Sequence, residues 1–529
     1  MSGRTRTGSA KTRRRFLTTL ASVTVTSALS GLAAPAFSRA AQRPVFTHGV
    51  QSGDVSADSG MVWARTDRPA RMLIETATTD SFKEIISASF VDALPETDFT
   101  AKALIEDLPP DQDIFYRLRF QDLFSTKAIS EPMVGHFRTA PSDRRSISFV
   151  WSGDTAGQGW GIDESRGGMR TYATMQRSRP DFFVHCGDSI YADCTIPAQQ
   201  KLPTGETWRN IITEAKSRVA TTLAEYRGNY KYNLLDANLR TFNAEVPIFA
   251  QWDNHEVMED WWPGEAFDRR GYNVKSALLL AARGCRAFHE FMPLRYTPSE
   301  PGRIYRKISY GPLLELFLLD MRSYRGPNDA TPESNYGPDA HLLGPVQLAW
   351  LKRELNRSTA TWKVIASDTP LGTIAASAPF ARAPLGRGIE IADLLSFMQR
   401  AGVRNTVWIT ADLHYTAAHY FDPNGGVFED FEPFWEFVSG PIHAGTWTPC
   451  RLDRTFGPRV VFQSAASHDQ GDNLAPCFGL QFFGHVSIDG RTGVLTVTLK
   501  DVDDRALWST QIEPKYGQSV RHPSQPLPG

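Results

Sequence analysis

Acidic side chains that follow apolar segments are the residues of this chain best suited to chemistry. The segment 181–184, Asp-Phe-Phe-Val, has the length and composition of a buried strand. It is followed by Gly187 and Asp188, with Tyr191 three residues further on. A lone Gly-Asp pair is typical of an ordinary turn. The chemical interpretation therefore depends on whether other strands end in the same way.

Four further apolar segments end in oxygen or imidazole groups. The segments 147–151, 246–252, 362–367 and 406–410 are predicted to be strands. The groups that follow the five strands are, in chain order, Asp154, Asp188, Asn254, Asp368, and Asp412 with His414. In a doubly wound sheet the carboxyl ends of the strands converge in one crevice. Because none of these end groups is a Lys or Arg, we expect them to form a cation site.

The predicted ligands are hard oxygen donors together with one imidazole: Asp154, Asp188, Tyr191, Asn254, Asp368, Asp412 and His414. This set suits Fe³⁺, Ca²⁺, Mg²⁺ or Mn²⁺ better than a zinc site rich in His and Cys. Without a cation, the carboxylates would repel one another and raise their own pKa values. Two metal ions about 3.5–4 Å apart, bridged by one carboxylate, would relieve this repulsion and clamp a phosphoryl group. The residues therefore favour hydrolysis of phosphate esters.

His255 has a separate predicted role. It directly follows Asn254, so the two side chains cannot easily face the same metal ion. The imidazole is then available to stabilise charge on phosphoryl oxygens or to protonate the leaving alkoxide. A hydrogen-bonded structural histidine is the alternative, and the position next to Asn254 favours the catalytic role.

Two arginines are weaker candidates for the substrate site. Arg322 and Arg325 follow Asp320, which ends the apolar segment 313–319. An internal ion pair with Asp320 is the favoured interpretation. Binding of a phosphate group by either arginine is the alternative.

Length and composition predict a soluble protein with more than one domain. The chain has 529 residues, which is too long for one ordinary core. Its formal net charge of -1 gives no indication of nucleic-acid or membrane-surface binding. Residues 41–140 contain short predicted strands at 60–64, 71–77 and 114–120, which is typical of an immunoglobulin or fibronectin-like β-sandwich. We expect no chemistry in this part, and its Asp54 is predicted to be a turn residue.

From residue 146 onward, predicted strands alternate with predicted helices, as in an α/β domain. One helix is expected to begin at Gly344-Pro345, because proline suits the first helical turn. Another contains Ile391, Leu394, Leu395 and Met398 at helical spacing, with Gly402 placed to end it.

Residues 1–40 are predicted to be an export signal. The sequence Thr-Arg-Arg-Arg-Phe-Leu at 12–17 matches the twin-arginine signal, and the following apolar run is too polar for a membrane span. A basic, disordered N-terminus is the alternative. We expect export through the twin-arginine translocation machinery to the periplasm or the medium, with no stable membrane span.

Cysteine usage leaves the disulfide question open. Cys186 lies within a predicted strand and is expected to be a buried thiol. Cys450 and Cys477 are the best candidates for a disulfide, which the sequence does not decide. The polar tail 516–529 is expected either to cover the site or to be disordered.

These motifs resemble the calcineurin-like metallophosphoesterase superfamily and, over about residues 44–510, the PhoD-type alkaline phosphatase family. The segments that carry the resemblance are 49–54, 62–65, 187–191, 252–256, 319–325 and 343–351. The resemblance implies a four-layered αββα metallophosphoesterase domain over residues 146–515, preceded by the N-terminal β-sandwich and the twin-arginine leader.

The resemblance also implies roles for the first metal site. Asp188 would bridge the two metals, Tyr191 would be a phenolate ligand of Fe³⁺, and His414 would bind the first metal. The best-known PhoD-type enzymes carry a Cys thiolate as the first ligand, with Fe³⁺ and Ca²⁺ in the site. This chain has Asp154 at the corresponding position, as in the wider superfamily.

For the second metal, the resemblance implies Asn254 and Asp412, and also Asp368 at the position of a late His in related phosphatases. Because this site is rich in carboxylates, a hard cation such as Ca²⁺ is favoured. We therefore expect two or more metal ions, Fe³⁺ and Ca²⁺ before Mn²⁺, Mg²⁺ or Zn²⁺.

The residues and the resemblance together predict an exported, metal-dependent alkaline phosphatase. It would hydrolyse small phosphate monoesters by attack of a metal-bound hydroxide, with His255 and Asp188 as catalytic residues. A phosphodiesterase or phospholipase D-like enzyme of the same family is the alternative. A surface binding protein with purely structural metals is the non-enzymatic alternative, and the spare imidazole of His255 argues against it.

Overall fold

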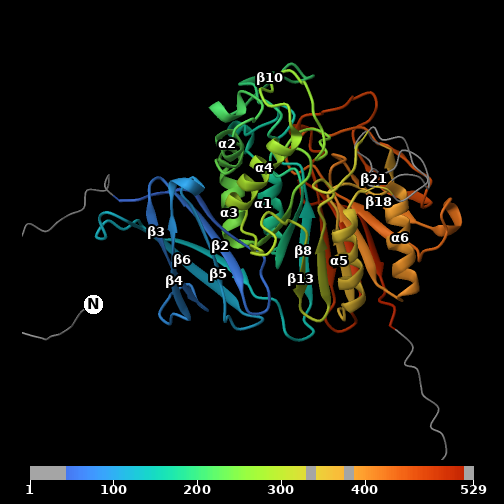
Figure 1. Cartoon of the computed structure of the whole chain (residues 1–529), viewed down its shortest axis with the longest axis horizontal. Helices are drawn as coiled ribbons and strands as arrows, with labels where there is room; N and C mark the ends of the chain where they lie inside the picture. The colour runs from blue at the N-terminus through green and yellow to red at the C-terminus, as the bar shows by residue number, and fades with distance from the viewer. Residues whose placement is uncertain (1–42, 329–336, 338–340, 375–386, 517–529) are drawn as a thin grey trace, which may run out of the picture.

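A seven-stranded β-sandwich lies at one side of the molecule and helices α5 and α6 lie at the opposite side (Figure 1). The computed structural model describes residues 43–328, 337, 341–374 and 387–516. One layer of the sandwich contains β1 (Phe46–Gly53), β2 (Gly60–Thr66) and β5 (Thr100–Ile105). The other layer has the order β4 (Ser87–Ala93), β3 (Ala70–Ala77), β6 (Asp113–Asp122) and β7 (Met133–Arg138). The predicted N-terminal sandwich is confirmed.

The sandwich forms because its strands alternate between buried apolar and more exposed residues. Met72 and Ile74 of β3 are buried, and the residues between and beside them are partly exposed. Tyr116, Leu118 and Phe120 of β6 follow the same period of two. Successive side chains of a strand point to opposite faces, so each strand lines the core with one face only.

Two mixed β-sheets pack face to face in the second domain. The first contains β8 (Ile147–Ser152), β9 (Phe182–Cys186), β12 (Ile248–Gln251), β22 (Phe482–Ile488), β23 (Leu495–Asp501) and β24 (Ala506–Ile512). The second contains β13 (Arg306–Tyr310), β14 (Leu314–Leu318), β15 (Trp362–Ala366), β17 (Thr406–Thr410), β19 (Phe434–Val438), β18 (Thr416–Phe421) and β21 (Pro458–Ser464). Strands β8, β9 and β12 are parallel, as are β14, β15, β17 and β19. The predicted ligand strands therefore belong to two facing sheets, not to one doubly wound sheet.

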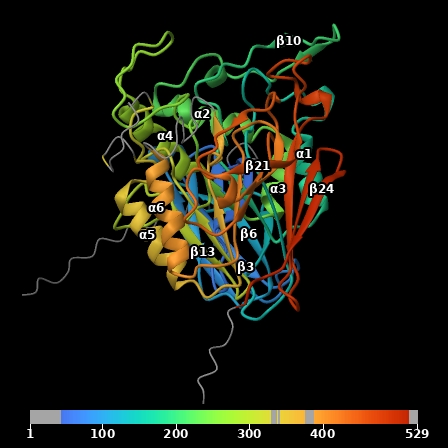
Figure 2. The same cartoon turned by 90° about the vertical axis from the view of Figure 1, so that its right-hand side faces the viewer.

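Helices cover the outer face of each sheet. The first sheet is covered by α1 (Arg170–Arg177), α2 (Leu223–Asn233), α3 (Ala237–Glu245) and α4 (Ala277–Phe291). The second is covered by α5 (Gly344–Arg357) and α6 (Arg387–Arg400), which lie side by side in both views (Figures 1 and 2). Both helices occur where the sequence predicts them. Short elements complete the chain: β10 (Gln199–Lys201), β11 (Thr207–Arg209), β16 (Thr373–Ile374), β20 (Arg451–Leu452), and 3₁₀ turns at Pro95–Thr97, Glu164–Arg166, Glu214–Lys216, Pro423–Gly425 and Pro476–Phe478.

Strand residues are shared between three apolar cores. In β8, Phe149 belongs to the core between the sheets, and Val150 belongs to the core beneath α1–α4. In β15, Val364 belongs to the core between the sheets, and Ile365 belongs to the core beneath α5 and α6. Strands buried on both faces read as continuous apolar runs, as these do. The predicted four-layered αββα domain is confirmed.

The sandwich and the αββα domain are joined by more than the connecting chain. Strand β1 pairs with β12 at Gly53 and Ile248, so the first sheet continues into the sandwich. Next to this pair, the carboxylate of Asp54 is completely buried and lies 2.7 Å from the guanidinium of Arg306. It also accepts a 2.7 Å hydrogen bond from the backbone N–H of Arg295. Asp54 follows β1 with a positive φ of 44°, as a turn residue can, and its carboxylate in addition links the two domains.

The five cysteines are all free thiols. The suggested disulfide between Cys450 and Cys477 is therefore not formed, and Cys186 is buried in its strand as predicted. Among the described residues, no helix is long and apolar enough to cross a membrane. The predicted signal at 1–40 and all of the tail 516–529 except Tyr516 lie outside the described residues.

Candidate metal centre

Six aspartates follow strands of the two facing sheets at the same position, the second residue after the strand. They are Asp154, Asp188 and Asp253 after β8, β9 and β12, and Asp320, Asp368 and Asp412 after β14, β15 and β17. All six strands end at the carboxyl edges of parallel ladders. Such edges are where α/β sheets collect functional groups.

Three of the predicted ligands form one close group. Asp154, Asp188 and His414 each offer a ligand atom, and these atoms lie within 4.8 Å of one another. The Nε2 atom of His414 lies 3.7 Å from a carboxylate oxygen of Asp154. The same Nε2 lies 2.7 Å from the phenol oxygen of Tyr191. The structure thus brings together the four residues predicted for the first metal, all of them buried.

The imidazole of His414 is oriented for a ligand on one side only. Its Nδ1 donates to the carbonyl oxygen of Gly445 at 2.5 Å, which leaves the Nε2 lone pair facing Tyr191 and Asp154. Burial lowers the pKa of His414 to about 3, so the ring is neutral near pH 7. A neutral imidazole fixed by a carbonyl at its other nitrogen is the usual form of a metal-ligating histidine.

A second close group shares Asp188 with the first. The carboxylates of Asp188, Asp253 and Asp412 offer atoms within 4.8 Å of one another. Asp412 is one of the ligands predicted for the second metal, and Asp253 is not, although its neighbour Asn254 is. The regular position two residues after the strand is the sequence signal that would have found Asp253. Since Asp188 belongs to both groups, it has the placement that a bridging carboxylate requires.

The ligand loops adopt unusual backbone angles. Asp154, Asp188, Asp412 and His414 have φ values of 65°, 51°, 65° and 55°, in the left-handed region. Non-glycine residues in this region are uncommon, and such strain concentrates at functional sites. Gly187 has a φ of +107°, and a Cβ atom there would lie 2.5 Å from the Cβ of Asp253. Only glycine lets the loops after β9 and β12 approach this closely.

The buried oxygen atoms of the centre fit a hard cation. Both carboxylate oxygens of Asp154, one of Asp253 and the side-chain oxygen of Asn254 have no hydrogen-bond partner among the described residues. Burial raises the pKa of Asp154 and of Asp188 well above the usual range. Buried carboxylates without partners are costly, and cations bound to their oxygens remove that cost.

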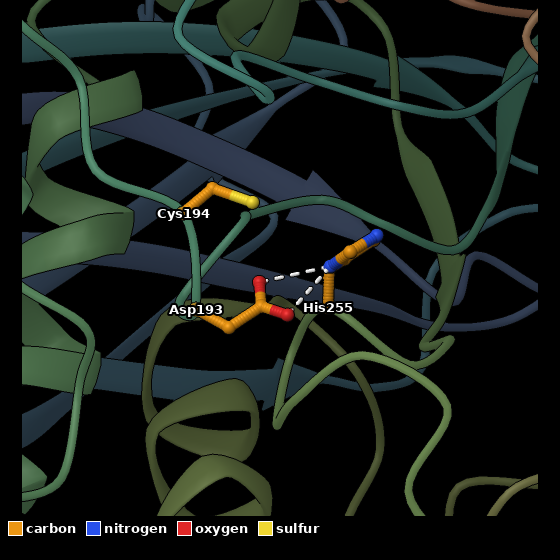
Figure 3. Close-up of side chains that lie close together, drawn as sticks. All are labelled: Asp193, Cys194 and His255. Atoms are coloured by element: carbon orange, nitrogen blue, oxygen red, sulfur yellow. Dashed lines mark hydrogen bonds and ion pairs between the residues drawn. The ribbon is translucent and has the colours of Figure 1, made fainter. Parts of the chain in front are cut away.

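His255 is paired with an acid that the sequence did not reveal. Its Nδ1 lies 2.8 Å and 3.0 Å from the two carboxylate oxygens of Asp193, and the ring faces that carboxylate (Figure 3). Its ring also stacks on Tyr191, with centroids 4.3 Å apart. Its backbone N–H donates to Asp188 at 3.1 Å. No motif marks Asp193, because the pairing depends on how the two loops fold together.

The carboxylates around His255 favour its charged form. Burial lowers the pKa of His255, but the charges of Asp193 and Asp188 outweigh burial and hold that pKa well above the usual value. The neighbouring thiol of Cys194 is not ionised, because burial raises its pKa to about 12. The group of Asp193, Cys194 and His255 in Figure 3 is therefore an acid–imidazolium pair beside a neutral thiol.

Arg322 pairs with a different acid from the predicted one. Its Nε lies 2.5 Å from the carboxylate of Asp253, and its side chain is fully buried. Asp320 instead accepts hydrogen bonds from the indole N–H of Trp252 at 3.0 Å and from the backbone N–H of Arg322 at 3.1 Å. The predicted ion pair between Arg322 and Asp320 is wrong, because the backbone turn holds the Asp320 carboxylate.

Both predicted arginines lie deep in the protein. The Nη1 and Nη2 atoms of Arg322 have no hydrogen-bond partner among the described residues, and Nη1 lies 3.9 Å from the carboxylate of Asp260. Arg325 is also buried, and burial together with the charge of Arg322 lowers its pKa well below the usual value.

Asp368 is the one predicted carboxylate that belongs to neither close group. Its two oxygens accept backbone hydrogen bonds from Met321 at 3.0 Å and Thr369 at 3.1 Å. Burial and the neighbouring charge of Asp253 raise its pKa well above the usual range.

Comparisons with known proteins agree with this architecture. A family model described as PhoD-like phosphatase matches residues 149–499, and a model of the PhoD-like phosphatase N-terminal domain matches residues 31–141. Alkaline phosphatase D of Bacillus subtilis (strain 168) is 27% identical over 426 residues, which cover 76% of this chain and 69% of that protein.

Two solved structures share the fold. The structure of PhoD has a TM-score of 0.67 and 20% identity, covering 92% of this chain and 95% of that one. The purple acid phosphatase PPD1 from yellow lupin (Lupinus luteus) seeds has a TM-score of 0.56 and 13% identity, covering 90% and 75% of the two chains.

Proposed function

The chain belongs to the PhoD-like phosphatase family and is therefore a phosphoric ester hydrolase, and we propose that it hydrolyses phosphate monoesters at a pair of metal ions. The observation that carries this proposal is the position of Asp188, which belongs to both close groups of ligand atoms. A carboxylate shared in this way can hold two cations at the spacing that suits phosphoryl transfer. Membership of a phosphatase family leaves no support for the non-enzymatic alternative.

Asp154, Asp188, Tyr191 and His414 would hold the first metal. Their support is the short contacts of His414 to Tyr191 and Asp154, and the unpartnered oxygens of Asp154. When bound, the metal pair supplies a hydroxide at neutral pH and withdraws charge from the phosphoryl oxygens.

Asp188, Asn254 and Asp412 would hold the second metal, and we add Asp253 to this set because it closes the second group. The side-chain oxygen of Asn254 is buried without a partner, which supports its role. Asp368, with both oxygens held by the main chain, is the weakest member of the predicted set.

His255 would act as the general acid. As an imidazolium it can donate a proton from Nε2 to the leaving alkoxide, while Asp193 holds Nδ1 and fixes the ring. Arg322 would bind a phosphoryl oxygen through its Nη atoms, which make no hydrogen bond among the described residues. Arg325 is a second, weaker candidate for the same task.

Fe³⁺ in the first site and Ca²⁺ in the second are the metals we favour. A buried tyrosine beside a carboxylate pair suits Fe³⁺, and a cluster of carboxylates suits Ca²⁺. Mn²⁺, Mg²⁺ and Zn²⁺ are the alternatives. Protein with bound iron should show a visible tyrosinate-to-iron absorption band that Tyr191→Phe abolishes. An iron-free, colourless protein with full activity would refute the iron assignment.

Monoester preference is tested by parallel assays. We expect faster hydrolysis of 4-nitrophenyl phosphate than of bis(4-nitrophenyl) phosphate by the same preparation. Cleavage of the diester alone would overturn the monoester proposal and favour the phosphodiesterase or phospholipase D-like alternative.

Export through the twin-arginine machinery is the proposed route to the periplasm or the medium. Its support is the arginine run at 13–15 followed by Phe16 and Leu17. Replacing Arg13, Arg14 and Arg15 by lysine should trap the protein inside the cell, and unchanged export of that variant would contradict the proposal.

A further inference from the structure

An exposed aromatic side chain, Trp447, borders the metal centre. Trp447 is 37% exposed, whereas the ligands of the first group and His255 are all buried. The ring centroids of Trp447 and His414 are 6.3 Å apart, with the ring planes at 76°. Part of an aromatic side chain is thus presented to solvent directly beside a predicted metal ligand.

Trp447 is held in place by both its backbone and its side chain. Its backbone N–H donates to the carbonyl of His414 at 3.1 Å, and its own carbonyl accepts from Ala466 at 3.2 Å. Its indole N–H donates to the side-chain oxygen of Gln158 at 3.2 Å. Gln158 follows β8 and Trp447 follows β19, so the contact joins loops from the two facing sheets. A rigid aromatic surface loses little entropy when a ligand binds.

The loop around Trp447 is braced by a neighbouring loop. Thr446 and Leu474 exchange two backbone hydrogen bonds of 2.9 Å. Thr448 donates from its backbone and its hydroxyl to Asp472, at 3.0 Å and 2.7 Å. These contacts fix the residues on both sides of Trp447, so its exposure is not that of a loosely held surface side chain.

The side chains around the centre, here called the rim, are Trp447, His414, Tyr191, His255 and Glu259. They are aromatic at one end and anionic at the other. Tyr191 lies between His255 and His414, with ring centroids 4.3 Å and 6.1 Å away. Trp447 packs edge-on against His414, and the largely exposed carboxylate of Glu259 lies 3.6 Å from Nε2 of His255. The organic part of an ester that extends past His414 would reach the exposed Trp447, and one that extends past His255 would face Glu259. A planar apolar group gains contact with the indole, and an anionic group is repelled by Glu259.

We propose that Trp447 is a specificity-determining residue that binds a planar, uncharged aromatic organic group of the phosphate ester. The inference rests on the proposed function and names the class of monoester that this rim favours. Trp447 touches the organic group and takes no part in the proton or phosphoryl transfer.

The test compares the hydrolysis of 1-naphthyl phosphate and glycerol 2-phosphate by wild type, Trp447→Leu and Trp447→Phe. We expect Trp447→Leu to lower kcat/KM for the naphthyl ester about tenfold more than for the glycerol ester, mainly through KM, as loss of one stacking contact would. Trp447→Phe should recover most of the difference. Phe124→Ala, which removes an aromatic ring that is 89% exposed on the sandwich, is the matched control and should leave both esters unaffected.

Two outcomes would overturn the inference. Equal losses on both esters in Trp447→Leu would show that the residue only supports His414. An unchanged preference for the naphthyl ester would show that the indole does not touch the substrate. Wild-type protein that hydrolyses neither monoester would overturn the proposed function itself, and this inference with it.

Discussion

At the scale of single residues, the pair of His255 and Asp193 determines where a proton can be held. Asp193 accepts at 2.8 Å from Nδ1, so the proton on Nε2 is the one available to a leaving group. The imidazole ring is also held by stacking on the ring of Tyr191. Asp193 touches no reacting atom and is a positioning residue that acts through His255.

We predict that Asp193→Asn lowers kcat by about 10- to 100-fold, since general acid catalysis contributes roughly 10²–10⁴-fold and part of it survives. Loss of the carboxylate also removes the charge that raises the pKa of His255. The imidazole then loses its proton at a lower pH, so the alkaline limb of the kcat profile moves to lower pH. A merely structural role would leave that limb in place.

Cys194→Ser is the matched control, because it changes the adjacent residue of the same loop and keeps its size. It should retain kcat, the pH profile and the metal content. An Asp193→Asn variant with the wild-type kcat and pH profile would contradict the role assigned to this pair.

The sequence predicts most of the candidate metal ligands, but it does not predict the residues that hold the catalytic side chains in place. Asp154, Asp188 and Asp412 could be predicted because each follows an apolar run by a fixed interval. Asp253 follows β12 by the same interval and could be predicted by the same rule. Asp193 follows no strand end, and its role arises only when the loop after β9 meets the loop after β12.

At the scale of elements, the close approach of the loops after β9 and β12 positions the shared carboxylate. Glu256 accepts backbone hydrogen bonds from Ser189 at 2.6 Å and from Asp253 at 2.8 Å, which ties the two loops together. Gly187 sits at this junction with a left-handed backbone.

We predict that Gly187→Ala disrupts the centre, because its Cβ would lie 2.5 Å from the Cβ of Asp253 at a φ of +107°. Backbone strain alone costs about 1–3 kcal/mol, and the clash must also displace Asp188 or Asp253. We expect lower thermal stability, less bound metal and loss of most activity.

Gly205→Ala is the control for strain without a clash. Gly205 has a φ of +87°, and a Cβ atom there meets nothing within 4 Å. This variant should lose some stability and keep full activity and metal content. Equal activity losses in the two variants would contradict the proposed role of the β9–β12 junction.

The elements themselves could be predicted well, and their assignment to sheets could not. Apolar runs identified β8, β9, β12, β15 and β17, and helical spacing identified α6. A strand buried on both faces has the same pattern in one central sheet as in either of two stacked sheets. The pattern of apolar residues therefore does not show whether the strands lie in one sheet or in two stacked sheets.

At the scale of the whole molecule, the seam between the sandwich and the αββα domain is built from buried polar groups. Asp54 and Arg306 form its ion pair, and the ammonium of Lys102 donates to the carbonyl of His289 at 2.6 Å. None of these contacts could be predicted from sequence, because each joins residues far apart in the chain. The seam makes the sandwich part of the folded unit.

We predict that acid weakens the protein at this seam. Burial and the charge of Lys102 lower the pKa of His289 from 6.5 to about 4. Between these values the unfolded chain binds a proton that the folded protein does not, so stability falls as the pH falls from 6.5 to 4. His289→Leu should remove up to about 3 kcal/mol of this loss.

Urea unfolding at pH 7 and pH 4.5 measures the effect. The difference in stability between the two pH values should be smaller in His289→Leu than in wild type. An equal change in the free energy of unfolding in both proteins would show that protonation of His289 does not cause the loss of stability.

The proposed hydrolysis depends on two cations held around Asp188. The most direct test removes all metal from the purified protein and follows hydrolysis of 4-nitrophenyl phosphate as metal is added back. We predict that the stripped wild type is inactive and regains activity with bound metal, and that Asp188→Ala, folded as wild type, does not regain it. A metal-free protein that hydrolyses the ester at the full rate would refute the metal-dependent mechanism.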